Sequence, residues 1–582
     1  MKRFPLLAGL FLLAGALIGP AAGGNAPRRG AASLPSALLL GAARSGLLGQ
    51  TAGRRGRAPR LVVLISIDQF RADYLERFAD LYLPPSQDGG APGGFRYLKE
   101  RGAWYADCRY DHYRTVTAVG HAVLGTGAQP SIGGIVGNSW WDTRTRKTVY
   151  CVDDPGARVI GAESGSKETP MSAANLDTTT TADELELATG GASRTVALAL
   201  KDRAAILLIG HRADTAIWFD EETGGWVSSS AYCKSGTLPA WVTSLNGRRL
   251  ADQMRQQPWT PSVEDAALAR TRVIGSGSRR FTHALTGRDY LPFATSPQGN
   301  AFVFDTAKEA VRAEELGRDE VPDFLAMNLS SNDYVGHRYG PDSAEVLDIS
   351  VRTDRQLADF LGFLNRSVPG GLAAVTIAIS ADHGVVPIPE LQGQDGVPVA
   401  RAIGAQIVGA AERALDAQVG AGDWIASSDN GELSLHPDTV ARFAREPRER
   451  LEHVAVAAVM GVEGVLFAVG KSDVLAGRVP RSNLGRRITQ SLHPHRSGDV
   501  IVILKPQWLA GGARTGTGTS HGSPHPDDTH VPLLIAGAGF RAGTYTTPVS
   551  PARLAPSLSH VLRVGRPSGA DEPLLPGLAG AE

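Results

Sequence analysis

Three apolar runs that each end in an aspartate constrain the fold of this chain more than any other feature. They are residues 61–68 (LVVLISID), 324–333 (FLAMNLSSND) and 373–383 (AAVTIAISADH). Continuous apolar runs of this length are typical of strands buried on both faces of a sheet. Ligand sites in parallel sheets lie beyond the carboxyl ends of the strands, so the sequence predicts that these aspartates meet at one edge.

Amphipathic stretches lie between the apolar runs, for example residues 343–364. Alternation of buried strands with helices predicts an α/β fold, a mainly parallel sheet sandwiched by helices. The apolar runs 500–504 and 531–535 are expected to add strands to it. The segments around 213–300 and 398–490 break the alternation, and we interpret them as inserted cap segments.

The charge balance and the cysteine count exclude several functional classes. The chain has 582 residues, with 59 Lys and Arg against 59 Asp and Glu. Proteins that wrap nucleic acid or coat anionic membranes need a basic excess, so neither is expected as an obligate partner. Three cysteines, Cys108, Cys151 and Cys233, are too few for a disulfide framework or a four-cysteine zinc module. A transition metal would depend on His and carboxylate ligands, and a disulfide between two of the cysteines stays open.

The first 24 residues have the basic, apolar and small-residue parts of a secretory signal peptide. Their apolar run is shorter than a membrane span requires, and no later stretch is long and apolar enough to cross a bilayer. We therefore expect an exported protein, periplasmic or secreted, with an uncleaved N-terminal anchor as the alternative. Residues 25–58, rich in Ala, Gly and Arg, are interpreted as a linker, and residues 59–582 as one domain carrying the two insertions.

Histidines near the strand-end aspartates predict a metal site. His337 follows Asp333 by four residues, a helical spacing that lets a carboxylate and an imidazole converge on one ion. Asp382 and His383 are adjacent at a strand end. Mixed oxygen and nitrogen ligands of this kind suit a two-zinc site with open coordination positions. The candidate ligands are Asp68, Asp333, His337, Asp382, His383 and His530.

The alternative interpretation is that these are structural aspartates and unrelated histidines. Two other histidines, His521 and His525, lie in a loop rich in Gly, Ser and Pro, where an exposed histidine is ordinary. We therefore assign them no role in the predicted site.

A hydroxyl and two cations complete the candidate chemistry. Thr117 precedes an apolar segment that could form a helix, and a helix N-terminus favours an alkoxide and an incoming phosphate. Lys201 and Arg203 stand just before residues 204–209, interpreted as a strand. In an extended segment their side chains would face the same way and could bind one oxyanion. The structural alternative for Thr117 is an ordinary helix cap. For Lys201 it is a solvated strand edge.

Seven ordered motifs, spread from residue 61 to the C-terminus, resemble the alkaline phosphatase superfamily. Within it they look most similar to PafA-type zinc-dependent phosphate monoesterases, relatives of the type I phosphodiesterases and nucleotide pyrophosphatases. The motifs are 66–71 (SIDQFR), 115–121 (TVTAVGH), 134–140 (GIVGNSW), 201–203 (KDR), 331–337 (SNDYVGH), 380–384 (SADHG) and 528–533 (DTHVPL).

This resemblance implies a role for each matching residue. Asp68, Asp382 and His383 would bind one zinc ion, to which Thr117 would also be presented. The second zinc ion would be bound by Asp333, His337 and His530. Asn138 matches the family's phosphate-binding asparagine, and Lys201 with Arg203 match the pair that marks its monoesterase branch.

The sequence thus predicts an exported, zinc-dependent alkaline phosphatase with an alkaline phosphatase-like catalytic domain at 59–582. The enzyme would use two Zn²⁺ ions and would hydrolyse small phosphate monoesters through a phosphothreonine intermediate on Thr117. One alternative is a phosphodiesterase or nucleotide pyrophosphatase on the same two-zinc site. Another is an exported zinc-binding protein without catalytic activity. The physiological substrate and the oligomeric state stay open.

Overall fold

The computed structural model describes residues 58–582 except 274–276, 402, 430, 512–517 and 580–582. The expected signal peptide at 1–24 and nearly all of the expected linker lie outside the described residues. No helix in the described part of the chain combines the length and the apolarity that a membrane span needs. The three cysteines are buried and unpaired, which answers the open question about a disulfide.

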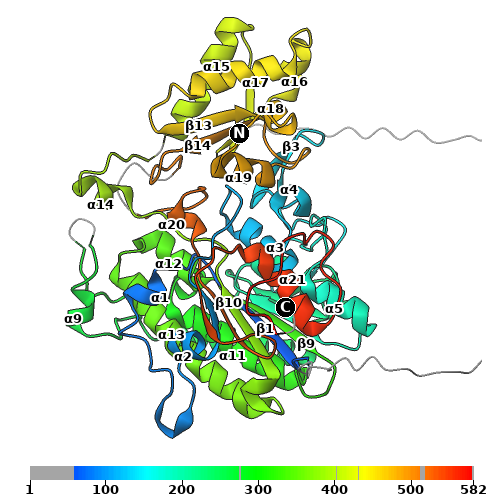
Figure 1. Cartoon of the computed structure of the whole chain (residues 1–582), viewed down its shortest axis with the longest axis vertical. Helices are drawn as coiled ribbons and strands as arrows, with labels where there is room; N and C mark the ends of the chain where they lie inside the picture. Colours follow the sequence, from blue (N-terminus) through cyan, green and yellow to red (C-terminus); the bar gives the residue numbers. More distant parts are fainter. Residues whose placement is uncertain (1–57, 274–276, 402, 430, 512–517, 580–582) are drawn as a thin grey trace, which may run out of the picture. The chain divides into compact units, whose positions relative to one another are not determined.

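A ten-stranded sheet lies at the centre of the main body, with helices flanking it (Figure 1). Neighbouring strands from β10 to β7 are parallel, while β15, β2 and β8 introduce antiparallel pairs. The expected α/β fold with a mainly parallel sheet is therefore confirmed. In spatial order the strands are β16 (Gly543–Tyr545), β2 (Ala103–Tyr105), β15 (Leu533–Gly537), β10 (Val375–Ser380), β1 (Leu61–Ile67), β9 (Asp323–Leu329), β6 (Thr195–Ala199), β7 (Thr215–Phe219), β8 (Trp226–Ser229) and β5 (Val159–Ile160).

The three apolar runs form the adjacent strands β10, β1 and β9, in which every residue is buried. Ser66 of β1 lies opposite Ser380 of β10 and Asn328 of β9, so the three strands end in step. Asp68 and Asp382 each follow the paired serine of their strand by two residues. The register therefore brings the strand-end carboxylates to one edge of the sheet.

A second, four-stranded sheet occupies much of the segment expected as the later insertion. The run 500–504 belongs here and not to the main sheet, because β14 pairs with β12 and β13. An apolar run predicts a strand but not its partners, which depend on contacts distant in sequence. The earlier segment, 213–300, contributes β7 and β8 to the main sheet before its helices begin. The strands of the small sheet are β11 (Ile425–Asp429), β12 (Glu432–Leu435), β14 (Val500–Leu504) and β13 (Val465–Gly470).

The expectation of a strand at 204–209 is wrong. These residues belong to helix α6 (Asp202–Ile209), and the strand is the preceding β6. A short apolar run does not distinguish a buried helix from a buried strand by its periodicity. The Ala and Leu residues of the run favour the helix. Lys201 is consequently the extended residue before a helix, and Arg203 lies in its first turn.

Further helices connect and cover these strands, and a hairpin of β3 (Ser139–Asp142) and β4 (Lys147–Tyr150) stands apart from both sheets. In the main body the helices are α1 (Tyr74–Arg77), α2 (Phe95–Arg101), α3 (Thr117–Thr126), α4 (Pro130–Gly133), α5 (Thr181–Thr189), α7 (Ala240–Gly247), α8 (Leu250–Met254), α9 (Asp265–Leu268), α10 (Leu291–Ala294), α11 (Pro297–Ala313), α12 (Ser331–Tyr339), α13 (Ala344–Ser367), α14 (Pro389–Gln394), α20 (Pro526–Thr529) and α21 (Leu554–Leu562). Beside the small sheet they are α15 (Gly404–Gln418), α16 (Pro437–Arg442), α17 (Arg448–Val459), α18 (Lys471–Leu475) and α19 (Asn483–Ser491).

Candidate active site

The carboxyl ends of β1 and β10 bring together a first group, which consists of Asp68, Asp382 and His383. All three side chains are fully buried. His383 Nε2 lies 3.2 Å from Asp382 Oδ2 and 3.6 Å from Asp68 Oδ1. These three atoms have no hydrogen-bond partner in the described structure. Unpaired buried polar atoms are costly, and a cation between them would remove that cost.

The tautomer of His383 supports the same conclusion. His383 Nδ1 is 2.9 Å from the carbonyl oxygen of Gly384, so Nδ1 carries the proton and donates it. The lone pair of Nε2 then faces the two carboxylates. Metal-binding histidines are usually oriented by such a hydrogen bond from the second ring nitrogen. The donor set of the first group therefore fits a metal ion.

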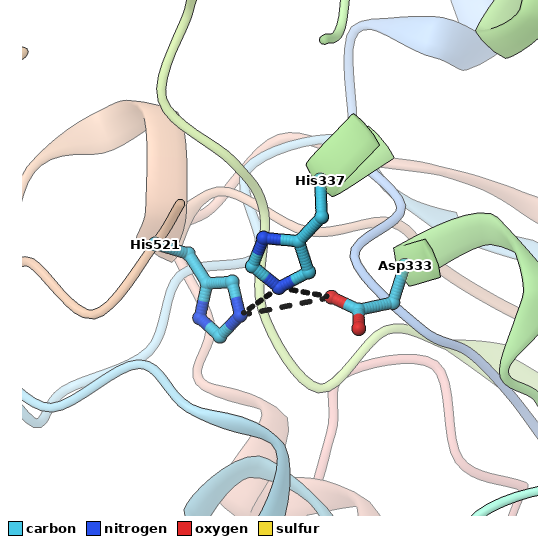
Figure 2. Close-up of side chains that lie close together, drawn as sticks. All are labelled: Asp333, His337 and His521. Carbon is cyan, nitrogen blue, oxygen red and sulfur yellow. Dashed lines mark hydrogen bonds and ion pairs between the residues drawn. The ribbon is translucent and has the colours of Figure 1, made fainter. Parts of the chain in front are cut away.

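A second group consists of Asp333, His337 and His521 (Figure 2). His337 Nε2 lies 3.2 Å from Asp333 Oδ1 and 3.2 Å from His521 Nε2. The Nδ1 atoms face the backbone carbonyls of Thr519 at 2.9 Å and Thr115 at 2.7 Å, respectively. Both histidines thus direct Nε2 toward the aspartate, which is the arrangement found in the first group.

The structure corrects the expectation that His530 completes the second group. His530 Nε2 is 3.1 Å from the carbonyl oxygen of Ala106, and no described metal-binding cluster contains it. His521, which we expected to be exposed, is buried and occupies the place beside His337. The cause lies in Asp528, whose Oδ2 accepts hydrogen bonds from the backbone N–H groups of Gly522 and Ser523 and turns the loop inward. The small residues beside His521, which permit that turn, are the signal that could have identified it.

Lys201 donates hydrogen bonds to one aspartate of each group. Its Nζ lies 2.8 Å from Asp68 Oδ2 and 2.6 Å from Asp333 Oδ2. Burial alone would raise the pKa of Asp333, but His337 and Lys201 hold it well below its usual range. For Asp68, burial and the neighbouring charge of Asp382 raise the pKa well above its usual range. The edge of the sheet thus concentrates negative charge that cations must balance.

Two neighbours, His121 and Gln69, lie against these groups, and His121 Nδ1 is also 3.4 Å from Asp382 Oδ2. His121 faces the carbonyl of Thr117 with Nδ1, at 2.8 Å, and Asn328 Nδ2 with Nε2, at 2.8 Å, so both ring nitrogens are engaged. Gln69 has a φ of 63°, in the left-handed region that non-glycine residues seldom adopt. That conformation lets its side-chain amide donate to Asp333 Oδ1 at 2.6 Å.

Thr117 is the first residue of α3, a helix that contacts the first group through its opening turn. A Cβ on Gly120 would lie 2.1 Å from the carbonyl oxygen of Asp382, so only glycine allows this close approach. Thr117 is 1% exposed. Asn138 Oδ1 accepts the N–H of Ala118 at 2.9 Å, which places its amide beside the start of the helix. The expected helix N-terminus at Thr117 is present.

Arg203 is half-buried near Lys201 but is bound elsewhere. Its Nη1 donates to the hydroxyl of Tyr150 at 3.1 Å, and that hydroxyl donates to Asp202 at 2.6 Å. The Nε of Arg203 has no hydrogen-bond partner in the described structure. Lys201 and Arg203 therefore do not share an extended edge, although both lie at the carboxyl end of β6.

The small sheet contacts the residues that lead into Thr117. The hydroxyl of Tyr113 donates to Glu432, and Arg114 Nη1 lies 3.3 Å from the same carboxylate. Arg114 Nη2 lies 3.1 Å from Asp429. Arg114 and Glu432 are buried, whereas Asp429 is half-exposed. Contacts from β11 and β12 thus hold the segment just before the candidate nucleophile.

The fold and the site together place two groups of carboxylates and imidazoles at the carboxyl ends of a mainly parallel sheet, beside the start of a helix. The sequence matches the family described as type I phosphodiesterase / nucleotide pyrophosphatase over residues 62–527. The chain belongs to this family.

Several relatives are similar over almost their whole length. A protein of Myroides odoratus named "Calcium-transporting ATPase" is 33% identical over 88% of this chain and 93% of its own. Alkaline phosphatase PhoV of Synechococcus elongatus is 33% identical over 88% and 91%. Alkaline phosphatase PafA of Elizabethkingia meningoseptica is 32% identical over 92% and 97%. A crystal structure of wild-type PafA covers 90% of this chain and 99% of its own, with a TM-score of 0.81 and 30% identity. The fold is alkaline phosphatase-like, as the motifs predicted.

Proposed function

We propose that this chain is an exported, two-zinc alkaline phosphatase that hydrolyses phosphate monoesters through a phosphothreonine at Thr117. Its relatives PhoV and PafA are alkaline phosphatases, and on that ground the chain is a phosphatase. One observation carries the proposed metal site: two groups of carboxylates and imidazoles lie beside the start of α3, and the histidines of both groups are oriented by a hydrogen bond from Nδ1 to a backbone carbonyl.

The first group would hold one zinc ion together with the Thr117 hydroxyl, and the second group would hold the other. When bound, the two ions would lower the pKa of a coordinated hydroxyl or water and neutralise charge on the departing oxygen. His521 takes the place that the sequence assigned to His530. Export is supported by the sequence pattern of residues 1–24.

The residues of the chain set the course of the reaction. The Thr117 oxygen attacks phosphorus in line with the bond to the leaving oxygen, forming the phosphothreonine as that bond breaks. The leaving oxygen departs on the side of Asp333 and His337. Water then attacks the same phosphorus from the vacated side. The bond between phosphorus and the Thr117 oxygen breaks, inorganic phosphate leaves, and the Thr117 oxygen stays on the side chain and takes up a proton. The helix N-terminus favours negative charge at Thr117 throughout.

Three further side chains account for a preference for monoesters. A monoester presents one more charged oxygen than a diester, and that oxygen needs a cation where a diester needs space for a second organic group. Lys201 lies between the two groups, Arg203 lies half-buried nearby, and Asn138 lies beside Ala118. Positioned donors of this kind dominate phosphoryl transfer.

The test compares Thr117→Ala and Lys201→Ala with the unmodified protein on an aryl phosphate, its methyl diester and an aryl sulfate, with zinc measured on each preparation. Thr117→Ala should lose turnover by about a thousandfold or more and still bind vanadate. Lys201→Ala should lose about a hundredfold on the monoester and much less on the diester. Near-normal turnover by Thr117→Ala would refute the assignment of Thr117 as the nucleophile.

The description of the matched family names phosphodiesterases, so phosphodiester hydrolysis on the same two-zinc site is the second candidate function. If the unmodified protein hydrolysed the diester faster than the monoester, the assignment of Lys201 and Arg203 to monoester recognition would be wrong. A chelator should abolish both activities, and added zinc should restore them.

A further inference from the structure

A cavity of about 680 Å³ adjoins the second group. His337, Arg338 and Tyr339 line it from the end of α12, and Phe281 and His283 line it from the segment between α9 and α10. Its size is ordinary for a small-molecule site, which commonly measures about 300 to 1,000 Å³. Nothing in the proposed phosphoryl transfer uses this space.

His337 connects the cavity to the candidate metal centre. Its side chain is 36% exposed, whereas those of the other five candidate ligands are at most 7% exposed. His337 is therefore the member of the two groups that a ligand in the cavity can approach. The leaving oxygen of a bound ester is assigned to this side, so the organic part of the ester would extend into the cavity.

One wall of the cavity consists of packed rings. Phe281 stacks on His283 with centroids 4.7 Å apart, and His283 stacks on Tyr339 with centroids 5.0 Å apart. His283 Nε2 is 3.0 Å from Glu345 Oε1, which fixes the middle ring. These contacts hold the three rings of the wall in place.

Three arginines line the cavity, and two of them are neutralised. Arg272 Nη1 lies 2.6 Å from Asp395, and Arg280 Nε lies 2.6 Å from Asp265. Arg338 is exposed, and its guanidinium lies 5.3 Å from the centroid of the Tyr339 ring. No carboxylate of the described residues pairs with it. The carboxylate of Glu345 also lines the cavity and is engaged by His283, so Arg338 is the lining arginine without a carboxylate partner among the described residues.

We propose that this cavity is the leaving-group subsite, and that Arg338 gives it a preference for esters whose leaving group carries a second anionic substituent. This subsite rests on the proposed function in one respect, the position assigned to the phosphate group. Arg338 touches the leaving group and not the reacting phosphorus, so it determines specificity.

The test uses two aryl phosphates of matched shape, 3-carboxyphenyl phosphate and 3-carbamoylphenyl phosphate, with phenyl phosphate as a reference. The ratio of kcat/KM between the carboxylate and the amide should fall about three- to fivefold in Arg338→Gln, as expected for one exposed ion pair. The rate on phenyl phosphate, which lacks the second substituent, measures any general change in activity. The control Arg280→Gln, a paired arginine of the same cavity, should keep the ratio of the unmodified protein.

A binding experiment separates failure of this proposal from failure of the proposed function. The Kd of 3-carboxybenzylphosphonate and of benzylphosphonate is measured for each variant by calorimetry. Tighter binding of the carboxylate that disappears only in Arg338→Gln supports the subsite even if no ester is hydrolysed. Equal carboxylate preference in the unmodified protein and in Arg338→Gln, in both rates and Kd, overturns the subsite whatever the activity on phenyl phosphate.

Discussion

The contact between the small sheet and the segment before Thr117 makes Glu432→Gln a demanding test of how the nucleophile is positioned. Glu432 accepts a hydrogen bond from the Tyr113 hydroxyl, pairs with Arg114 and accepts the N–H of Gly498 at 2.7 Å. Glutamine keeps one acceptor oxygen and replaces the other with an NH₂ donor. At least one of those three donors must then lose its partner.

The expected magnitude follows from burial. The Arg114 side chain is 2% exposed, and after the substitution its remaining carboxylate is the half-exposed Asp429. Removing one partner of a buried ion pair costs about 3 to 5 kcal/mol. Because Asp429 still pairs with Arg114, we expect Glu432→Gln to lower the free energy of unfolding by about 2 to 3 kcal/mol. The matched change Asp429→Asn removes an exposed partner and should cost under about 1 kcal/mol.

Urea unfolding measures the loss of stability, and steady-state kinetics on an aryl phosphate measures the effect on Thr117. A displacement of about 1 Å at a reacting group can cost about a hundredfold in rate. We therefore expect kcat of Glu432→Gln to fall by at least tenfold, with KM changed much less. Equal stability losses in Glu432→Gln and Asp429→Asn, or an unchanged kcat in the former, would refute the positioning argument.

Three further predictions concern the metal groups and the thiols. His521→Ala should reduce bound zinc to about one ion per chain by mass spectrometry, whereas His530→Ala should retain both; the opposite result would restore the original ligand assignment. Gly120→Ala places a Cβ 2.1 Å from the carbonyl oxygen of Asp382, so it should lower both the zinc content and the thermal stability. A variant that binds as much zinc as the unmodified protein and is equally stable would contradict the close packing of α3 against Asp382. All three cysteines are buried and free, so a thiol reagent should label three per chain only after denaturation, and a reductant should leave Tm unchanged.

The sequence predicted the class of fold and the first group because both depend on local patterns. Asp68 and Asp382 end apolar runs, and parallel strands place their carboxyl ends together whatever the details of the loops. Thr117 was likewise correctly expected at the start of a helix. The positions of these residues follow from their own neighbours in sequence.

The remaining assignments depend on contacts between distant segments, which spacing does not show. His521 lies beside Asp333 at the start of a loop that Asp528 holds through the backbone N–H groups of Gly522 and Ser523. The run after Lys201 is apolar in either a strand or a helix, so its periodicity could not decide between them. The contacts of Glu432 with the segment before Thr117 link residues more than three hundred positions apart, and no motif records them.

The central claim is that Thr117 forms a covalent phosphoryl intermediate, and trapping that intermediate tests it most directly. The protein is mixed with an excess of an aryl phosphate, quenched in acid within milliseconds, digested and analysed by tandem mass spectrometry. The account predicts one phosphorylated peptide, carrying phosphate on Thr117, that is absent in Thr117→Ala. Active turnover with phosphate on another residue, or with no phosphopeptide at any quench time, would contradict it.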